Sequence, residues 1–188
     1  MVTYLGAACD LSLAHIEQPH VWSLVEKAQV FILHAAFLPQ FNTKEVNEMI
    51  SYSGIVFGNE SEAAAFGDAH SLTDKTIHAA RYIADLPFAD GEKRKRLVII
   101  TQGKDPIIYT DSTDPTVHQY VVEQLKDEEM VDTNGAGDSF AAGFIADYIR
   151  GKPMITSLQS GVRAAAYIIR RSGFSLGSRE SSAFKINL

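Results

Sequence analysis

The chain has 188 residues, and its 46 % of hydrophobic and 21 % of charged residues lie close to globular averages. This composition predicts about one folded domain, spanning residues 1–188, and excludes a disordered polymer. The 17 Lys and Arg are outnumbered by 23 Asp and Glu, for a formal charge of -6, so we expect no nucleic-acid partner.

The cysteine content and the apolar runs indicate the compartment. Cys9 is the single cysteine and cannot form an internal disulfide or a zinc cluster, which favours a reducing compartment such as the cytosol. Apolar runs such as residues 97–100 are too short to cross a bilayer, and the first residues lack a signal-peptide pattern, so we expect no membrane partner. We interpret the basic run at residues 93–96 as a solvated loop; the alternative is a nuclear-import patch.

Short β-branched runs alternate with longer segments of helical period, which predicts an α/β fold with a mostly parallel sheet. Three runs lack polar alternation, as expected of strands covered on both faces, and we place them at the centre of the sheet. They are residues 30–33, 55–57 and 97–101. Residues 107–110 and 117–122 flank a turn-rich stretch at 111–115 and predict a hairpin at the sheet edge, because Pro115 bars a central strand.

Helices are predicted where apolar residues recur three or four apart. These segments are residues 22–28, 43–52, 60–66, 73–85, 137–150 and 155–171. The tail at residues 175–188 is rich in Ser and Gly, and we expect it to be loosely held.

A glycine-rich turn before the helix predicted at residues 137–150 has the character of an anion site. Small residues at Gly135, Ala136 and Gly137 let the backbone approach a ligand, and the first amides of the following helix have no intrahelical acceptors. These amides and the helix dipole predict an anion hole. Asp138 would lie beside a bound phosphoryl group and could accept the proton of an attacking hydroxyl.

A purely structural explanation of the same turn remains open on these residues alone. An acidic residue is favourable in the first turn of any helix, and glycines make ordinary tight turns. Short glycine motifs also match by chance, so the neighbouring motifs have to decide between the two interpretations.

Three motifs occur in the order found in one enzyme family. The sequence DTNGAGDSF at residues 132–140 resembles the second signature of the ribokinase-type (PfkB) carbohydrate and nucleoside kinases, and its Asn before the first Gly is most similar to the adenosine kinases of that family. GNESEA at residues 58–63 resembles the N-x-x-E motif of the family, and TQGK at residues 101–104 lies between the two. Residues 22–28 and 163–171 extend the resemblance over most of the chain.

The resemblance implies a ribokinase-like fold, which is Rossmann-like, with ATP as phosphate donor and Mg²⁺ as cofactor. It implies transfer of the γ-phosphoryl group of ATP to the 5'-hydroxyl of adenosine, giving AMP and ADP in purine salvage, with Asp138 as the catalytic base. Asn59 and Glu62 would serve magnesium and phosphate. The resemblance also implies nucleotide or substrate contacts, and these residues are Thr101, Gly103, Thr133 and Asn134.

Two of these assignments have structural alternatives. Asn59 and Glu62 are three residues apart, so they share a helix face and could act together through magnesium and its waters, but they equally fit an N-cap and its capping-box partner. Gly103 could allow close approach of a nucleotide, or it could be a plain turn glycine.

The resemblance also implies that parts of the family domain are missing. The chain lacks counterparts of the N-terminal sheet, the lid and the ribose-holding residues, and only residues 34–36 separate two segments, 30–33 and 37–41, that are farther apart in the family. We therefore expect a partial domain, monomeric if intact, whose exposed strand edges would allow self-association. The alternatives are another sugar or nucleoside kinase of the family, or a non-catalytic nucleotide-binding fragment.

Overall fold

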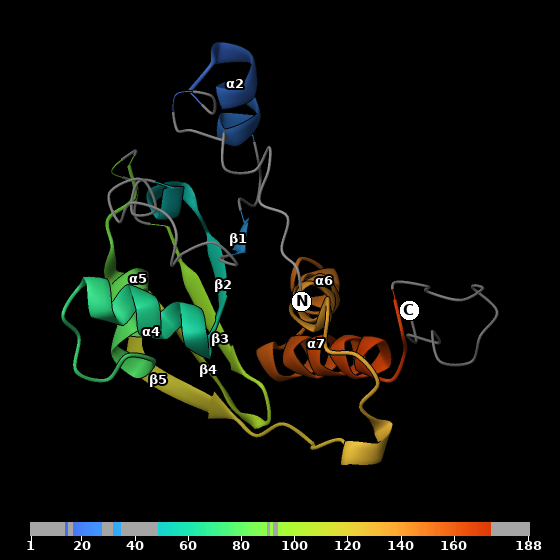
Figure 1. Ribbon diagram of the computed structural model, residues 1–188. Coiled ribbons are helices and arrows are strands. Elements are labelled where there is room, and N and C mark those ends of the chain that lie inside the picture. Colours follow the sequence, from blue (N-terminus) through green and yellow to red (C-terminus); the bar gives the residue numbers. More distant parts are fainter. Residues whose placement is uncertain are drawn as a thin grey trace. The chain divides into compact units, whose positions relative to one another are not determined.

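The computed structural model describes residues 14, 17–27, 32–34, 49–89, 91 and 94–173 (Figure 1). The chain divides into two compact units, which we describe separately. The first unit comprises residues 1–100 and 108–118, and the second comprises residues 101–107 and 119–188. The predictions for residues 37–41 and 175–188 lie outside the described residues.

A five-stranded sheet runs in the order β1-β2-β3-β4-β5. Its strands are β1 (Ile32–His34), β2 (Ile55–Asn59), β3 (Leu97–Gln102), β4 (Asp105–Asp111) and β5 (Asp114–Tyr120). β1 and β2 are parallel, with Ile32 opposite Ile55. Two-residue turns join β3 to β4 and β4 to β5, and connections this short join antiparallel neighbours. The sheet is therefore mixed: β1 and β2 are parallel, and hairpins join β3 to β4 and β4 to β5.

The strand order tests the predicted placement of each strand. β2 and β3 are interior, as predicted, and β1 is the end strand among the described residues. The hairpin at the opposite edge is confirmed, although its turn is only residues 112–113. Asp111 Oδ1 accepts hydrogen bonds from the amides of Thr113 (2.8 Å) and Asp114 (3.2 Å), which closes the turn early. Pro115 lies in the edge strand, where its missing N–H costs little.

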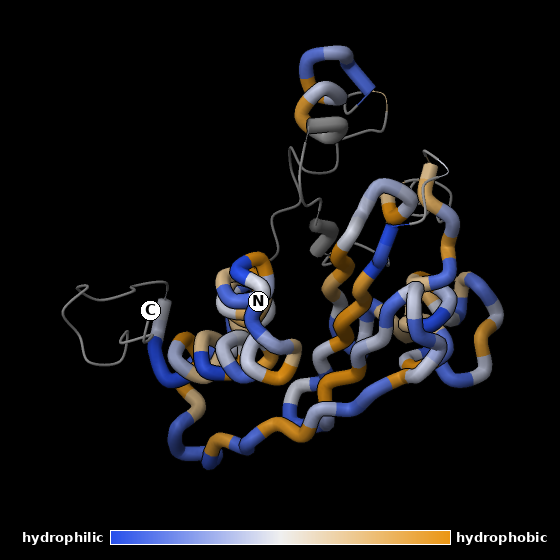
Figure 2. Tube along the Cα trace, turned by 180° about the vertical axis from the view of Figure 1, so that it is seen from behind, coloured by the Kyte–Doolittle hydropathy of each residue, from blue (hydrophilic) through white to orange (hydrophobic). Residues whose placement is uncertain are grey.

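The core of the first unit lies between one face of the sheet and two helices, α4 (Glu60–Ala69) and α5 (Ile77–Asp85). Its buried residues are Ile50, Val56, Ala63, Phe66, Ala79, Ala80, Ile83, Ala84, Val98, Ile100 and Ile108. Leu97 and Ile99 alternate with core residues of β3 and are equally buried, so β3 is covered on both faces, as its unbroken apolar run predicted. The apolar stretches of these strands stand out in Figure 2.

The helices begin and end where local hydrogen bonds dictate. The helix predicted from residue 73 begins only at Ile77, because Asp74 Oδ1 accepts hydrogen bonds from the amides of Thr76 (3.0 Å) and Ile77 (2.8 Å) and turns the chain before the helix. α2 (Pro19–Lys27) and α4 confirm the predictions at residues 22–28 and 60–66. Of the helix predicted at residues 43–52, residues 49–52 are helical and the rest lies outside the described residues.

Arg96 is a fully buried cation at the base of β3, so the interpretation of residues 93–96 as a solvated loop was wrong for this residue. Its guanidinium donates to the carbonyl oxygens of Ser53 (3.0 Å), Ile83 (3.2 Å) and Leu86, and it stacks on the ring of Phe88 at 4.1 Å. Burial, with a smaller effect of Arg94, lowers the pKa of Arg96 to about 10. This cation serves the carbonyls at the C-terminal end of α5, where the helix dipole favours positive charge.

The second unit is built on two helices, α6 (Ala136–Tyr148) and α7 (Met154–Ile169), which confirm the predictions at residues 137–150 and 155–171. They approach closely because glycines stand at the contact. A Cβ added at Gly143 would lie 2.6 Å from the carbonyl oxygen of Ser160, and one added at Gly161 would lie 2.8 Å from the ring of Phe140. The Ser160 hydroxyl donates to the buried carboxylate of Asp147 at 2.5 Å and fixes the register of the pair.

Within the described ranges, no helix combines the length and the apolar character that crossing a membrane requires.

Replacing Gly143 with Ala tests the close helix contact. Alanine has a higher helix propensity than glycine, so on propensity alone the substitution would stabilise α6. Because the added Cβ would overlap Ser160 and Ala164, we instead expect the free energy of unfolding to fall by about 1–3 kcal/mol in urea denaturation followed by circular dichroism. Gly54→Ala is the matched control, since its Cβ would meet nothing within 4 Å. Equal destabilisation by both variants would contradict this explanation.

Candidate functional site

The glycine turn, residues 132–138, leads from an extended segment into α6. Gly135 is the N-cap residue of α6 and has φ 75° and ψ 5°, the left-handed conformation that glycine adopts without a steric penalty. The first intrahelical bond runs from the amide of Ser139 to the carbonyl of Gly135 at 2.9 Å. The amides of residues 136–138 thus precede the hydrogen-bond ladder of α6, as an anion hole requires.

Hydrogen bonds inside the turn distinguish between these amides. The amide of Ala136 donates to the carbonyl oxygen of Thr133 at 3.2 Å, so it already has an acceptor within the turn. The amide of Asn134 donates to Asp132 Oδ1 at 2.9 Å, an Asx-type closure that bends the chain toward the helix. Of the three amides predicted to form the anion hole, those of Gly135 and Gly137 are therefore better suited than that of Ala136 to receive an anion.

Asp138 is the third residue of α6 and its only acidic residue in the first turn. Its side chain is exposed, and so are those of Thr133 and Asn134. A carboxylate at this position is favoured by the positive end of the helix dipole. The turn thus brings together, on one short segment at the start of a helix, a candidate base and candidate anion-binding amides.

Residues that fix this turn from outside were missed in the sequence. The carbonyl oxygen of Ile169, at the C-terminal end of α7, accepts hydrogen bonds from the amides of Val131 (2.9 Å) and Asp132 (3.0 Å). Arg170 pairs with Glu129 at 2.9 Å. These contacts join segments about forty residues apart, so residue spacing in the sequence does not predict them. The basic pair at the end of the helix predicted at residues 155–171 was the only sequence signal.

Asn59 and Glu62 form a complete capping box at the start of α4. Asn59 Oδ1 accepts a hydrogen bond from the amide of Glu62 at 2.9 Å, and Glu62 Oε2 accepts one from the amide of Asn59 at 2.8 Å. The structural alternative is therefore realised, and it explains both residues without a ligand. The side chain of Glu62 is 5 % exposed. In the described part of the chain, no group of three or more His, Cys, Asp or Glu is placed to hold a metal ion.

Thr101 and Gly103 lie at the end of β3 and in the turn to β4. Gly103 has φ 58° at the first position of this two-residue turn, where a positive φ favours glycine in hairpins. The plain turn explanation thus accounts for Gly103. Thr101 is partly buried.

The predicted site residues are divided between the two units. Asn59 and Glu62 belong to the first unit, whereas Thr101, Gly103 and the whole glycine turn belong to the second. Each group is locally well formed, and each is placed by the secondary structure that carries it.

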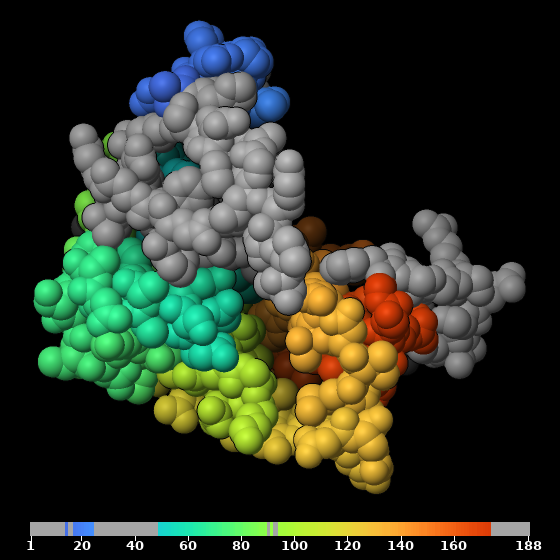
Figure 3. Space-filling model, viewed as in Figure 1, coloured from blue at the N-terminus to red at the C-terminus, as the bar shows by residue number. Residues whose placement is uncertain are grey.

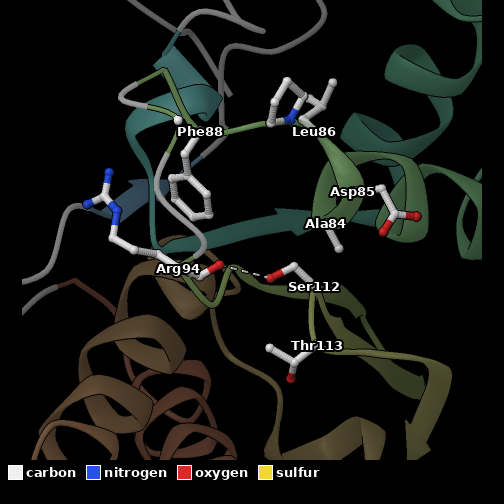
Figure 4. A pocket seen from close by; sticks show the side chains of 9 residues that line it. Ala84, Asp85, Leu86, Phe88, Arg94, Ser112 and Thr113 are labelled. Atoms are coloured by element: carbon white, nitrogen blue, oxygen red, sulfur yellow. Dashed lines mark hydrogen bonds between the residues drawn. The ribbon is translucent and has the colours of Figure 1, made fainter.

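A cavity of about 400 Å³ in the first unit contains none of the predicted site residues (Figure 4). The ring of Phe88 points into it from the loop after α5, and Ser112 and Thr113 line it from the turn between β4 and β5. Arg94 lies over the same ring at 4.7 Å, and its carbonyl accepts a hydrogen bond from Ser112. These contacts tie the β4–β5 turn to the segment that leads into β3.

Comparison with known proteins gives a consistent result. Residues 23–180 match the family described as pfkB family carbohydrate kinase. Adenosine kinase 1 of Arabidopsis thaliana is 32 % identical over 204 residues, which cover 92 % of this chain and 58 % of that protein. The chain thus spans less than two thirds of the length of this relative.

Solved structures agree with this result. Adenosine kinase from Schistosoma mansoni in complex with 2-fluoroadenosine is 66 % identical, with a TM-score of 0.83 over 96 % of this chain and 62 % of that one. A ribokinase from Thermotoga maritima is 22 % identical with a TM-score of 0.63 over 80 % of this chain and 46 % of that one, a likeness of fold alone. The predicted ribokinase-like fold is confirmed, and its sheet is the mixed one described above.

Substitutions at Glu62 test the capping box. Glu62→Ala removes the acceptor of the Asn59 amide, so we expect a loss of about 1 kcal/mol in the free energy of unfolding. Glu62→Gln retains an acceptor oxygen and should lose less than half as much. Glu60→Ala removes the same charge from the same first turn without removing the capping bond, and it serves as the matched control. If Ala and Gln at position 62 were equally destabilising in thermal and urea unfolding, the capping bond would not be what Glu62 contributes.

Proposed function

This chain belongs to the pfkB family of carbohydrate kinases, and on that basis we propose that it transfers the γ-phosphoryl group of ATP to the 5'-hydroxyl of adenosine, giving AMP and ADP. The observation that carries the proposal is the glycine turn, in which an exposed carboxylate follows a left-handed glycine at the start of a helix. The similarity to adenosine kinases over more than nine tenths of this chain supports adenosine as the acceptor.

Each part of the glycine turn has a role in this proposal. Asp138 accepts the proton of the attacking hydroxyl, and the amides of Gly135 and Gly137 donate to the oxygens of the transferring phosphoryl group. The dipole of α6 adds favourable potential at the same place. Asn134 and Thr133 are exposed beside this turn and would contact nucleoside or nucleotide, and Thr101 and Gly103 would contribute from the end of β3.

Asn59 and Glu62 suit a magnesium ion that comes with the nucleotide. They supply hard oxygen donors and one carboxylate, and Mg²⁺ usually takes one or two carboxylates and keeps several waters. The capping box uses Oδ1 of Asn59 and Oε2 of Glu62 as its acceptors. Because Glu62 is 5 % exposed, we propose that it acts through a water. Magnesium would neutralise phosphate charge during transfer.

Two other functions remain outcomes of the test. Another sugar or nucleoside could be the acceptor, as the breadth of the family suggests. A chain that binds ATP without turnover is favoured by one observation, namely that the match covers 58 % of the length of the Arabidopsis relative. We place the protein in the cytosol, since its cysteine content favours a reducing compartment.

Transfer of labelled phosphate from ATP to adenosine, beside ribose and fructose phosphate, tests the proposed function. We expect product with adenosine, and we expect Asp138→Asn to lower kcat by about 10²–10⁴-fold with little change in the KM for ATP. Glu123→Gln makes the same carboxylate-to-amide change at an exposed site and is the control. An equal loss of kcat and of ATP affinity in Asp138→Asn would reject Asp138 as the base, and ATP binding without any product would reject the kinase.

The Glu62→Gln variant separates the capping role from the magnesium role. It keeps the cap but loses the carboxylate charge, so we expect the Mg²⁺ concentration for half-maximal transfer to rise about tenfold while the unfolding midpoint changes little. An unchanged Mg²⁺ requirement would leave Glu62 with the structural role alone.

A further inference from the structure

The segment before the glycine turn is bound to the last turn of α7. An α-helix leaves its last carbonyls without intrahelical partners. In α7 the carbonyl of Ile169 is satisfied by two amides of a remote segment, those of Val131 at 2.9 Å and Asp132 at 3.0 Å. The side chains of Met130 and Val131 are exposed, so backbone hydrogen bonds rather than apolar burial hold the segment. The golden residues that precede α6 lie at the surface in Figure 3.

An ion pair reinforces this attachment one residue further along α7. Arg170 Nε and Nη2 both donate to Glu129 Oε1, at 3.1 and 2.9 Å. Glu129 Oε2 accepts a hydrogen bond from the amide of Lys126 at 3.0 Å, which closes the short helix η3 (Asp127–Glu129). The Lys126 amide and then Arg170 lower the pKa of Glu129, which therefore stays ionised at neutral pH. One carboxylate thus joins η3 to α7.

Hydrogen bonds connect this attachment to the first residue of α6, two residues before Asp138. Asp132, whose amide is held by Ile169, uses its carboxylate to hold the amide of Asn134 at 2.9 Å. The next bond runs from the amide of Ala136, the first residue of α6, to the carbonyl oxygen of Thr133. A shift of residues 129–132 along α7 would therefore move the start of α6, where Asp138 lies.

We propose that Arg170 and Glu129 are positioning residues for the glycine turn. Their ion pair holds residues 129–132 against the last turn of α7 and so sets where Asp138 and the amides of Gly135 and Gly137 lie. This inference rests on the proposed function, because it assigns the pair a role in phosphoryl transfer. Both residues lie in the second unit, as does the whole turn.

The Arg170–Glu129 ion pair should contribute more to the rate of phosphoryl transfer than to the free energy of unfolding. The side chains of Arg170 and Glu129 are 45 % and 35 % exposed, and exposed pairs add little to global stability. Transfer of a phosphoryl group depends on placement of the base to within a fraction of an ångström, and small misplacements cost up to about 100-fold in rate. Removal of the pair should therefore change kcat far more than it changes the unfolding midpoint.

Arg170→Gln is the main test, and Arg163→Gln is its matched control. Arg163 lies on the same helix, is exposed and makes no ion pair with any described residue. In Arg170→Gln we expect kcat to fall about tenfold with the KM for ATP nearly unchanged. We also expect hydrogen exchange at the amides of Val131 and Asp132 to quicken up to about fivefold. Arg170→Lys keeps a cation opposite Glu129 and should recover part of both effects.

The exchange measurement keeps this inference separate from the proposed function. If the wild-type chain transfers no phosphate, the kinase proposal fails, while faster exchange in Arg170→Gln alone would still support the attachment. Unchanged exchange at Val131 and Asp132 would overturn the inference. So would a kcat that falls no more in Arg170→Gln than in Arg163→Gln, or an unfolding midpoint that falls enough to account for the lost activity.

Discussion

The close approach of α6 and α7 is the constraint on which the candidate site depends. Gly143 and Gly161 leave no room for a Cβ between the helices, so the two backbones lie in direct contact. The Asp147–Ser160 hydrogen bond then fixes the register of α6 against α7. Because the glycine turn is joined to α6 at one end and to the last turn of α7 at the other, its geometry follows from this contact. The site is thus set by helix packing as well as by the motif itself.

The first unit places its motif by different means. Asn59 ends a buried strand and at once caps the helix that covers the sheet, so the position of Glu62 is set by the sheet, the cap and the core together. Arg96 serves the C-terminal end of the second covering helix, α5, where it donates to the carbonyls of Ile83 and Leu86. In both units, backbone groups at helix ends are bound by specific side chains or by remote backbone, and the glycine turn and the Asn59–Glu62 pair lie at such ends.

The sequence was informative where the signal is local. Gly135 and Gly103 adopt the positive φ that their turn positions suggest, and the N-x-x-E spacing forms a capping box. The ends of helices and strands were predicted less accurately, since Asp74 turns the chain before α5 and Asp111 turns it between β4 and β5. Contacts between segments that are distant in sequence could not be predicted. Burial of Arg96 depends on carbonyls of residues far from it in sequence, and the attachment of Val131 to Ile169 carries no periodicity that a pattern could detect.

The hydrogen bonds to Ile169 also affect the order in which parts of the chain can fold during synthesis. Protein synthesis proceeds from the N-terminus, and domains form as their parts emerge. The sheet and α4 and α5 precede the glycine turn in the chain, but the carbonyl that orders Val131 and Asp132 belongs to a residue made much later. The segment with the candidate base therefore reaches its final conformation only after the last turn of α7 has been synthesised. A chain released before Ile169 would lack the acceptor that holds the amides of Val131 and Asp132.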